Sequence, residues 1–226
     1  MLDSRAALLR RPLKTLAILI SGQGSNMASL ARACAEEGWP ARVAAVLSNR
    51  AAAPGLALAR EHGLHAEALP HASFERREAF EAALAARLEA LGADLVVLAG
   101  FMRILGEAFV RRFEGRLVNI HPSLLPSFPG LDTHARAIAA GVRVHGATVH
   151  LVTPTLDHGP ILAQAAVPVL DGDDAQRLAA RVLRAEHRLY PAAVRWLVED
   201  RVRVRDGRAE IDGVDASARL QWDSAR

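Results

Sequence analysis

Two polar residues at alternating positions, Asn119 and His121, stand at the end of a short apolar run and precede a proline-rich segment. Residues i and i+2 of a strand point to the same side, so an amide and an imidazole can serve one site. An amide N–H can stabilise the oxyanion of an attacked carbonyl, and a histidine can move protons near neutral pH. The pair suits acyl chemistry, and a hydrogen-bonded pair that closes the loop is the structural alternative.

A carboxylate, Asp157, stands in a turn (residues 155–160, Thr-Leu-Asp-His-Gly-Pro) just before another apolar run. Beside His121 it would hold the imidazole protonated, because a nearby anion favours the charged form. Taken alone, an aspartate before Gly-Pro is ordinary turn chemistry. Its expected position at a strand end favours the catalytic interpretation. The intervening segment is rich in further polar side chains: Ser123, Thr133, His134, His145 and Thr148.

A glycine-containing turn (residues 21–26, Ser-Gly-Gln-Gly-Ser-Asn) lies between an apolar run and a helix-like stretch. Glycines allow a close backbone approach, and the free amides at a helix start favour a phosphate. Neither the dinucleotide fingerprint nor the Walker motif fits, because Met27 stands where a third glycine is needed and no Gly-Lys-Ser/Thr follows. An anion site is therefore expected here, with a simple capped turn as the alternative.

The elements that must position these residues are short apolar runs separated by helical patterns. Residues 16–20, 43–47 and 95–99 lack alternation, which is typical of parallel strands buried on both faces. Residues 26–37 and 74–91 repeat apolar side chains at helical spacing. The order predicts an α/β fold with an open, mostly parallel twisted sheet and helices on both faces, a Rossmann-like architecture.

The second half of the chain predicts three more strands and a long closing helix. The strands are expected at residues 117–120, 147–152 and 161–167, and the helix at 173–197. Residues 201–205 and 208–211 are consistent with a small hairpin around Asp206 and Gly207. Because ligands of open α/β sheets bind at the carboxyl ends of strands, Asn119 and His121 are well placed.

Composition narrows the class of protein. The 226 residues are 51% hydrophobic, enough for one substantial core, and the net charge is only +3. Basic residues are scattered, which disfavours a nucleic-acid partner, and no apolar run is long enough to span a membrane. The single cysteine, Cys34, suits a reducing compartment. A cytoplasmic enzyme with small-molecule substrates is expected, as a monomer or homodimer and without a metal.

Three stretches, taken together, resemble the phosphoribosylglycinamide formyltransferases. They are residues 20–26, residues 98–105 (Leu-Ala-Gly-Phe-Met-Arg-Ile-Leu), and residues 117–130 together with 144–150 and 156–160. The resemblance implies the formyltransferase-type sheet over residues 14–205, between an amino-terminal extension (1–13) and a carboxyl-terminal tail (206–226). It also implies transfer of a formyl group from 10-formyltetrahydrofolate to the amine of 5'-phosphoribosylglycinamide in purine biosynthesis.

The resemblance assigns roles residue by residue. The catalytic residues it implies are Asn119, His121 and Asp157. The residues it places at the acceptor are Gly24, Ser25, Asn26 and Glu186. The residues it places at the folate are Arg77, Met102, Arg103, Ile104, Leu105, Asn119 and Asp157.

Three positions depart from the usual pattern of that family. Gln23 replaces a common asparagine, Asp132 stands where a histidine is usual, and His158 follows Asp157 where glycine is common. Asp132 puts a carboxylate in place of a possible donor at the rim of the expected site. None of the three belongs to the catalytic trio.

Three other functions compete with this interpretation. A formyltetrahydrofolate deformylase would use water in place of the amine, and usually has an amino-terminal regulatory domain. A methionyl-tRNA formyltransferase would need a basic carboxyl-terminal domain, for which few residues follow Asp200. A nucleotide-binding module using only the glycine turn would leave Asn119, His121 and Asp157 without a purpose.

Overall fold

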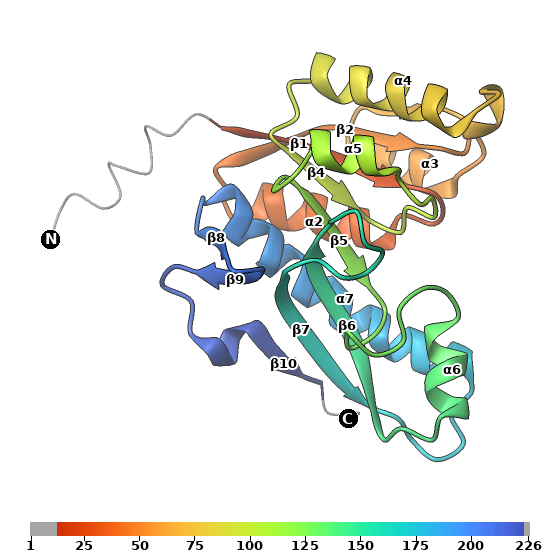
Figure 1. Cartoon of the computed structure of the whole chain (residues 1–226), viewed down its shortest axis with the longest axis vertical. Coiled ribbons are helices and arrows are strands. Elements are labelled where there is room, and N and C mark those ends of the chain that lie inside the picture. The colour runs from red at the N-terminus through yellow and green to blue at the C-terminus, as the bar shows by residue number, and fades with distance from the viewer. Residues whose placement is uncertain (1–12, 224–226) are drawn as a thin grey trace, which may run out of the picture.

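The computed structural model describes residues 13–223, so most of the expected extension (1–13) lies outside the described residues. Its main body is one twisted sheet with the strand order β10-β7-β6-β5-β4-β1-β2-β3 (Figure 1). The strands of this sheet are β1 (Lys14–Ile20), β2 (Ala41–Ser48), β3 (Ala66–Ala68), β4 (Leu95–Leu98), β5 (Leu117–His121), β6 (Val144–Leu151), β7 (Ile161–Pro168) and β10 (Leu220–Trp222).

The sheet changes character at β5. From β3 across to β5, neighbouring strands are parallel, whereas β6 runs antiparallel to both β5 and β7. The predicted α/β class and the mostly parallel sheet are therefore confirmed. The predicted strands all form, and β6 begins at Val144, three residues before the expected start.

Helices cover both faces of the sheet (Figure 1). The described helices are α2 (Ser25–Glu36), α3 (Pro54–Glu61), α4 (Arg77–Ala90), α5 (Glu107–Arg112), α6 (Thr133–Ala139) and α7 (Ala175–Val198), with short 3-10 turns η1 (His71–Ser73) and η2 (Ala216–Arg219). One core packs α2 and α7 against the sheet, and the opposite core packs α4 and α5. None of the described helices is long and apolar enough to cross a membrane.

The sequence of β1 shows no alternation of apolar and polar residues because the strand packs against a core on each face. Leu16, Ile18 and Ile20 belong to the core under α2 and α7. Ala17 and Leu19 belong to the core under α4 and α5. Both faces of β1 are buried, so both sets must be apolar.

The closing helix is held at its start by two aspartates. The Asp174 side chain accepts a hydrogen bond from the Arg177 amide, which caps α7. Asp173 instead forms a buried ion pair with Arg181, at 2.7 Å between Oδ2 and Nη1. The two aspartates at the start of α7 therefore have different partners.

The end of the chain returns to the main sheet. The predicted hairpin forms as β8 (Val202–Arg205) and β9 (Arg208–Ile211). After it, β10 pairs in parallel with β7, a strand that the sequence pattern did not predict. The Arg219 guanidinium donates to the carbonyls of Ile161 and Leu162, and this fixes the tail against β7.

Candidate active site

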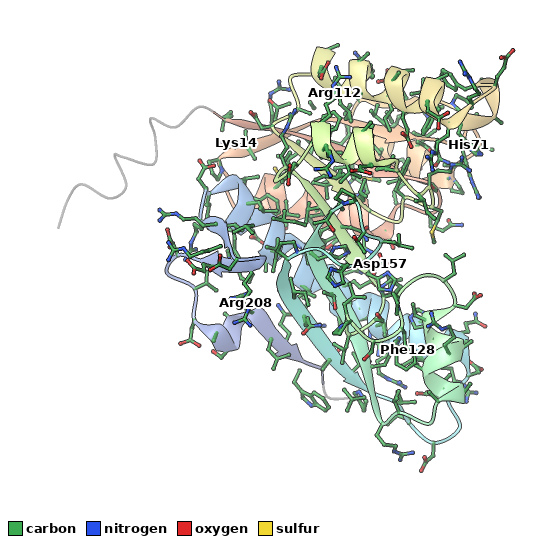
Figure 2. The ribbon with its side chains drawn as sticks, in the orientation of Figure 1. Lys14, His71, Arg112, Phe128, Asp157 and Arg208 are labelled. Atoms are coloured by element: carbon green, nitrogen blue, oxygen red, sulfur yellow. The ribbon has the colours of Figure 1, made fainter. Side chains whose placement is uncertain are left out.

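Asn119, His121 and Asp157 meet at the carboxyl end of β5, where the sheet changes from parallel to antiparallel. Asn119 and His121 lie on this strand, and Asp157 comes from the turn between β6 and β7. Asp157 Oδ2 lies 3.5 Å from His121 Nδ1, and both side chains are more than 90% buried. Figure 2 shows Asp157 near the middle of the molecule.

The backbone of Asp157 has a positive φ of 50°. Aspartate tolerates this left-handed conformation better than most residues. Its Oδ2 accepts a hydrogen bond from the Gly130 amide at 2.8 Å. The carboxylate is therefore held between His121 and the loop that follows β5.

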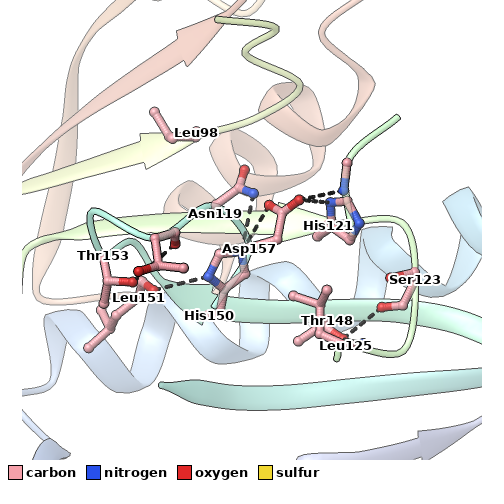
Figure 3. Close-up of polar contacts among 12 residues, drawn as sticks. Leu98, Asn119, His121, Ser123, Leu125, Thr148, His150, Leu151, Thr153 and Asp157 are labelled. Atoms are coloured by element: carbon pink, nitrogen blue, oxygen red, sulfur yellow. Dashed lines mark hydrogen bonds and ion pairs between the residues drawn. The ribbon is translucent and has the colours of Figure 1, made fainter. Parts of the chain in front are cut away.

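A fourth residue, His150 on β6, completes the cluster (Figure 3). Its Nδ1 lies 3.0 Å from the Leu151 carbonyl, which can only accept, so Nδ1 carries the hydrogen. Nε2 is then free to accept from the Asn119 amide at 3.3 Å. Burial lowers the pKa of His150, which favours the neutral ring that this arrangement needs.

His150 has no assigned role among the residues expected from the sequence. Asn119 pairs with His150 across β5 and β6, and His121 pairs with Thr148. A period of two from Thr148 puts His150 on the same face of β6, which is the signal that would have found it. Its Nε2 also lies 4.0 Å from Asp157 Oδ1, so one carboxylate faces both histidines.

His121 is anchored on its other side by a backbone carbonyl. Its Nε2 lies 3.0 Å from the Phe128 oxygen, so Nε2 donates. Phe128 has a positive φ of 53°, and its ring packs edge-on against His145 with centroids 5.7 Å apart. With Nε2 used in this way, Nδ1 is the ring nitrogen that faces Asp157.

His145 supports this loop as an uncharged ring. It is 1% exposed, and its ring lies 5.4 Å from that of His134, with the planes nearly perpendicular. Burial, with help from His134, lowers the pKa of His145 to about 4. At neutral pH the side chain therefore acts as a polar packing residue behind His121.

The glycine turn forms the start of α2. Gly24 has a φ of 80°, and a side chain there would put Cβ only 2.9 Å from Gly55 Cα. Gly55 in turn has no room for a side chain, because its Cβ would lie 2.8 Å from the Gly22 oxygen. Two glycines thus let loop and helix start touch, and only Gly24 was expected from the sequence.

Asn26 and Glu186 meet, although 160 positions separate them. Asn26 Nδ2 donates to Glu186 Oε2 at 2.6 Å, which joins the start of α2 to α7. Asn26 Oδ1 is buried and has no hydrogen-bond partner among the described residues. Burial raises the pKa of Glu186 to about 7, an effect that the Asn26 bond opposes. Asn26 Oδ1 can therefore still accept a hydrogen bond from a ligand, and Ser25 is the neighbouring residue.

Four of the residues expected at the folate, Met102, Arg103, Ile104 and Leu105, lie on the segment after β4. Met102 and Ile104 are 66% and 64% exposed, which is unusual for large apolar side chains and suits a binding surface. Arg103 and Leu105 are half-buried. The exposed Arg77 begins α4, with its Nε 3.6 Å from Glu81 Oε1, which accepts from the Gly106 amide.

The three departures from the family pattern are all exposed residues. Asp132 precedes α6, is exposed and has a positive φ of 55°. Gln23 and His158 are also exposed. None of the three side chains takes part in the hydrogen bonds that hold the cluster together.

Known proteins that are similar to this chain in sequence and fold include formyltransferases. Residues 14–194 match the family model described as "Formyl transferase". Phosphoribosylglycinamide formyltransferase of Escherichia coli (strain K12) is 44% identical over 198 residues, covering 88% of this chain and 93% of the relative. The structure of glycinamide ribonucleotide transformylase 1 from Symbiobacterium toebii has a TM-score of 0.87 and 46% identity, covering 89% and 95% of the two chains.

A formyltetrahydrofolate deformylase from Pseudomonas syringae shares the fold at lower identity. Its TM-score is 0.81 at 28% identity, and the match covers 88% of this chain but 66% of that one. The family model and the relatives agree with the resemblance carried by the sequence motifs. This chain belongs to the formyl transferase family.

Proposed function

We propose that this protein transfers a formyl group from 10-formyltetrahydrofolate to the amine of 5'-phosphoribosylglycinamide, in purine biosynthesis. Membership of the formyl transferase family supports a folate-derived donor. The single observation that carries the proposal is the contact of Asp157 with His121, 3.5 Å apart and buried at the carboxyl end of β5. We also propose that the enzyme is cytoplasmic and works as a monomer or homodimer.

In the proposed reaction the acceptor amine attacks the formyl carbon, and the carbonyl oxygen becomes an oxyanion. Asn119 Nδ2 and His121 Nδ1–H donate to that oxygen, since His150 holds the amide and Phe128 holds the ring. A doubly protonated His121 suits the position, because Nε2 donates to a carbonyl while Nδ1 faces a carboxylate.

Proton transfer completes the reaction. The attacking amine must lose a proton and the folate nitrogen must gain one when the carbon–nitrogen bond to the folate breaks. We assign this transfer to Asp157, acting through water. Holding the amine against the formyl carbon supplies much of the rate, since orientation can contribute roughly 7–11 kcal/mol.

We assign the acceptor to Gly24, Ser25, Asn26 and Glu186. The amides at the start of α2 suit its phosphate, and the unpartnered Asn26 Oδ1 with Glu186 suits its hydroxyl or amine groups. We assign the folate to the surface after β4, with Arg77 near its acidic tail. The residues of that surface are Met102, Arg103, Ile104 and Leu105.

The test is incubation with 10-formyltetrahydrofolate, with and without glycinamide ribonucleotide. We expect tetrahydrofolate to form only when the acceptor is present, together with an equal amount of formylated acceptor. Release of formate without the acceptor would assign the deformylase reaction instead. An inactive His121→Ala variant is the control for uncatalysed deformylation.

A further inference from the structure

A chain of hydrogen bonds crosses the carboxyl ends of four neighbouring parallel strands. Its members follow β4, β1, β2 and β3 in turn, and these strands are adjacent in the sheet. The members are Met102, Ser21, Asn49 and His71. Ser21 and Asn49 are each 3% exposed, so the middle of the chain is shielded from water.

Ser21 is the central member, and the direction of its bonds is fixed. Its hydroxyl donates to Asn49 Oδ1 at 2.5 Å, since an amide oxygen only accepts. The hydroxyl has one hydrogen, so the Met102 amide at 2.8 Å must be the donor of the second bond. Asn49 Nδ2 donates to His71 Nδ1 at 3.1 Å, and the backbone amide of His71 donates to the Asn49 carbonyl at 3.1 Å, so His71 restrains Asn49.

The two ends of the Ser21 contact belong to different parts of the proposed site. Ser21 is the first residue of the glycine turn that we assign to the acceptor phosphate, and Met102 is the first of those that we assign to the folate. The Ser21 amide also donates to the Gly100 carbonyl at 3.1 Å, so backbone and side chain join the same two loops. This chain of hydrogen bonds contains neither the catalytic trio nor His150.

We infer that Ser21 is a positioning residue that couples acceptor binding to folate binding. A ligand that orders the glycine turn fixes the Ser21 hydroxyl, and this hydroxyl fixes the Met102 amide at the start of the folate surface. Coupling of this kind is reciprocal, so each ligand tightens the other by the same factor. The inference rests on the proposed function, because it needs both ligands at these loops.

The test uses tetrahydrofolate and glycinamide ribonucleotide, which bind together without reacting because no formyl group is present. Isothermal titration calorimetry gives the Kd of each ligand alone and in the presence of the other. We expect each ligand to tighten the other by about fivefold or more in the wild type, the lower end of typical coupling. In Ser21→Ala we expect the factor to fall within about twofold of unity.

Two further variants separate coupling from a general loss of stability. Ser29→Ala removes a different hydrogen bond donated by a serine hydroxyl, from Ser29 Oγ to the His187 carbonyl at 2.7 Å. This bond is not part of the chain of hydrogen bonds through Ser21. The Ser29→Ala variant should keep the full coupling factor. Asn49→Ala leaves the bond between the Met102 amide and Ser21 but removes the acceptor of the Ser21 hydroxyl, so we expect an intermediate coupling factor. If Ser21→Ala does not fold, Asn49→Ala takes its place in the test.

The outcomes distinguish this inference from the proposed function. If wild-type protein binds neither ligand, the proposed function fails. If it binds both with independent affinities, or if Ser21→Ala keeps the full factor, the function stands and the coupling role of Ser21 is wrong. An equal loss of coupling in Ser29→Ala would also overturn it, because the effect would then reflect general destabilisation.

Discussion

The two halves of the sheet contribute to the candidate site in different ways. In the parallel half, the polar contacts come from loops after the strands, and backbone amides and glycines do most of the work. In the half containing β5 and β6, the cluster is formed by buried side chains on these two strands together with Asp157 from the turn after β6. Backbone amides tolerate changes of nearby side chains, whereas a catalytic imidazole has no substitute. The first half is thus suited to holding ligands and the second to chemistry.

The largest effect expected from this division is the loss of His121. His121→Ala should lower kcat/KM by roughly 10²–10⁴-fold, the usual contribution of a positioned acid or base. Asp157→Asn should also be strongly impaired, because the His121 ring loses the carboxylate that faces its Nδ1. Adding Asp157→Asn to His121→Ala should cost much less than it does alone.

A double-mutant cycle on kcat/KM across pH measures this, and circular dichroism checks that each variant folds. Fully additive losses would mean that Asp157 serves another purpose, such as shaping the turn after β6.

Glu186 on α7 is bonded to Asn26 at the start of α2. We expect its ionisation to change the free energy of unfolding. Burial raises the pKa of this carboxyl from 4.5 to about 7. Between these values the folded state keeps a proton that the unfolded state has lost, so stability falls as pH rises. The difference corresponds to roughly 3 kcal/mol. Below pH 4.5 the contribution of Glu186 is fully present, and above about 7 it is gone.

Urea unfolding of wild type and Glu186→Gln at several pH values between 4.5 and 8 tests this. The stability difference between the two proteins should shrink or reverse as pH rises through this window, and then stay constant. Parallel curves would show that the carboxyl ionises normally despite its burial.

A smaller effect is expected at the glycine turn. Gly24→Val should weaken acceptor binding by about tenfold or more, since left-handed backbone alone costs a side chain roughly 1–2 kcal/mol and contact with Gly55 adds to this. Folate binding should be nearly unchanged. Gly38→Val is the matched control, because Gly38 also has a positive φ but open space around it.

Ligand titrations of both glycine variants separate local strain from a binding defect. If Gly24→Val binds both ligands normally, the acceptor phosphate does not bind at this turn.

The smallest effect should come from the rim. Asp132→His restores the residue usual in the family, and we expect activity to change by less than about tenfold, or roughly 1.4 kcal/mol. Asp132 is exposed and does not contact the trio through any of the cluster's hydrogen bonds. Steady-state kinetics at fixed pH suffices, and a loss of several hundredfold would show that the site depends on the carboxylate.

Much of the fold could be predicted because burial leaves a direct pattern in the sequence. The apolar residues of β1 show both faces buried, and the period of two after Leu117 places Asn119 and His121 together. Contacts between distant segments leave no such pattern. The approach of Gly55 to Gly24, and the strand β10, depend on how loops cross in space. The family resemblance placed Asn26 and Glu186 at the same ligand, but their direct contact was not predicted.

The tail after α7 bears on the behaviour of the protein at high concentration. An outermost strand exposes unpaired backbone groups that can recruit strands of other molecules. On β7 the carbonyls of Ile161 and Leu162 are taken by Arg219, and that of Ala166 accepts from the Asp223 amide. β10 pairs with Gln164, Ala165 and Ala166, so the outermost strand on this side is a three-residue segment in place of an eight-residue one. Residues 219–223 therefore cover backbone groups of β7 that would otherwise be open to pairing with another strand.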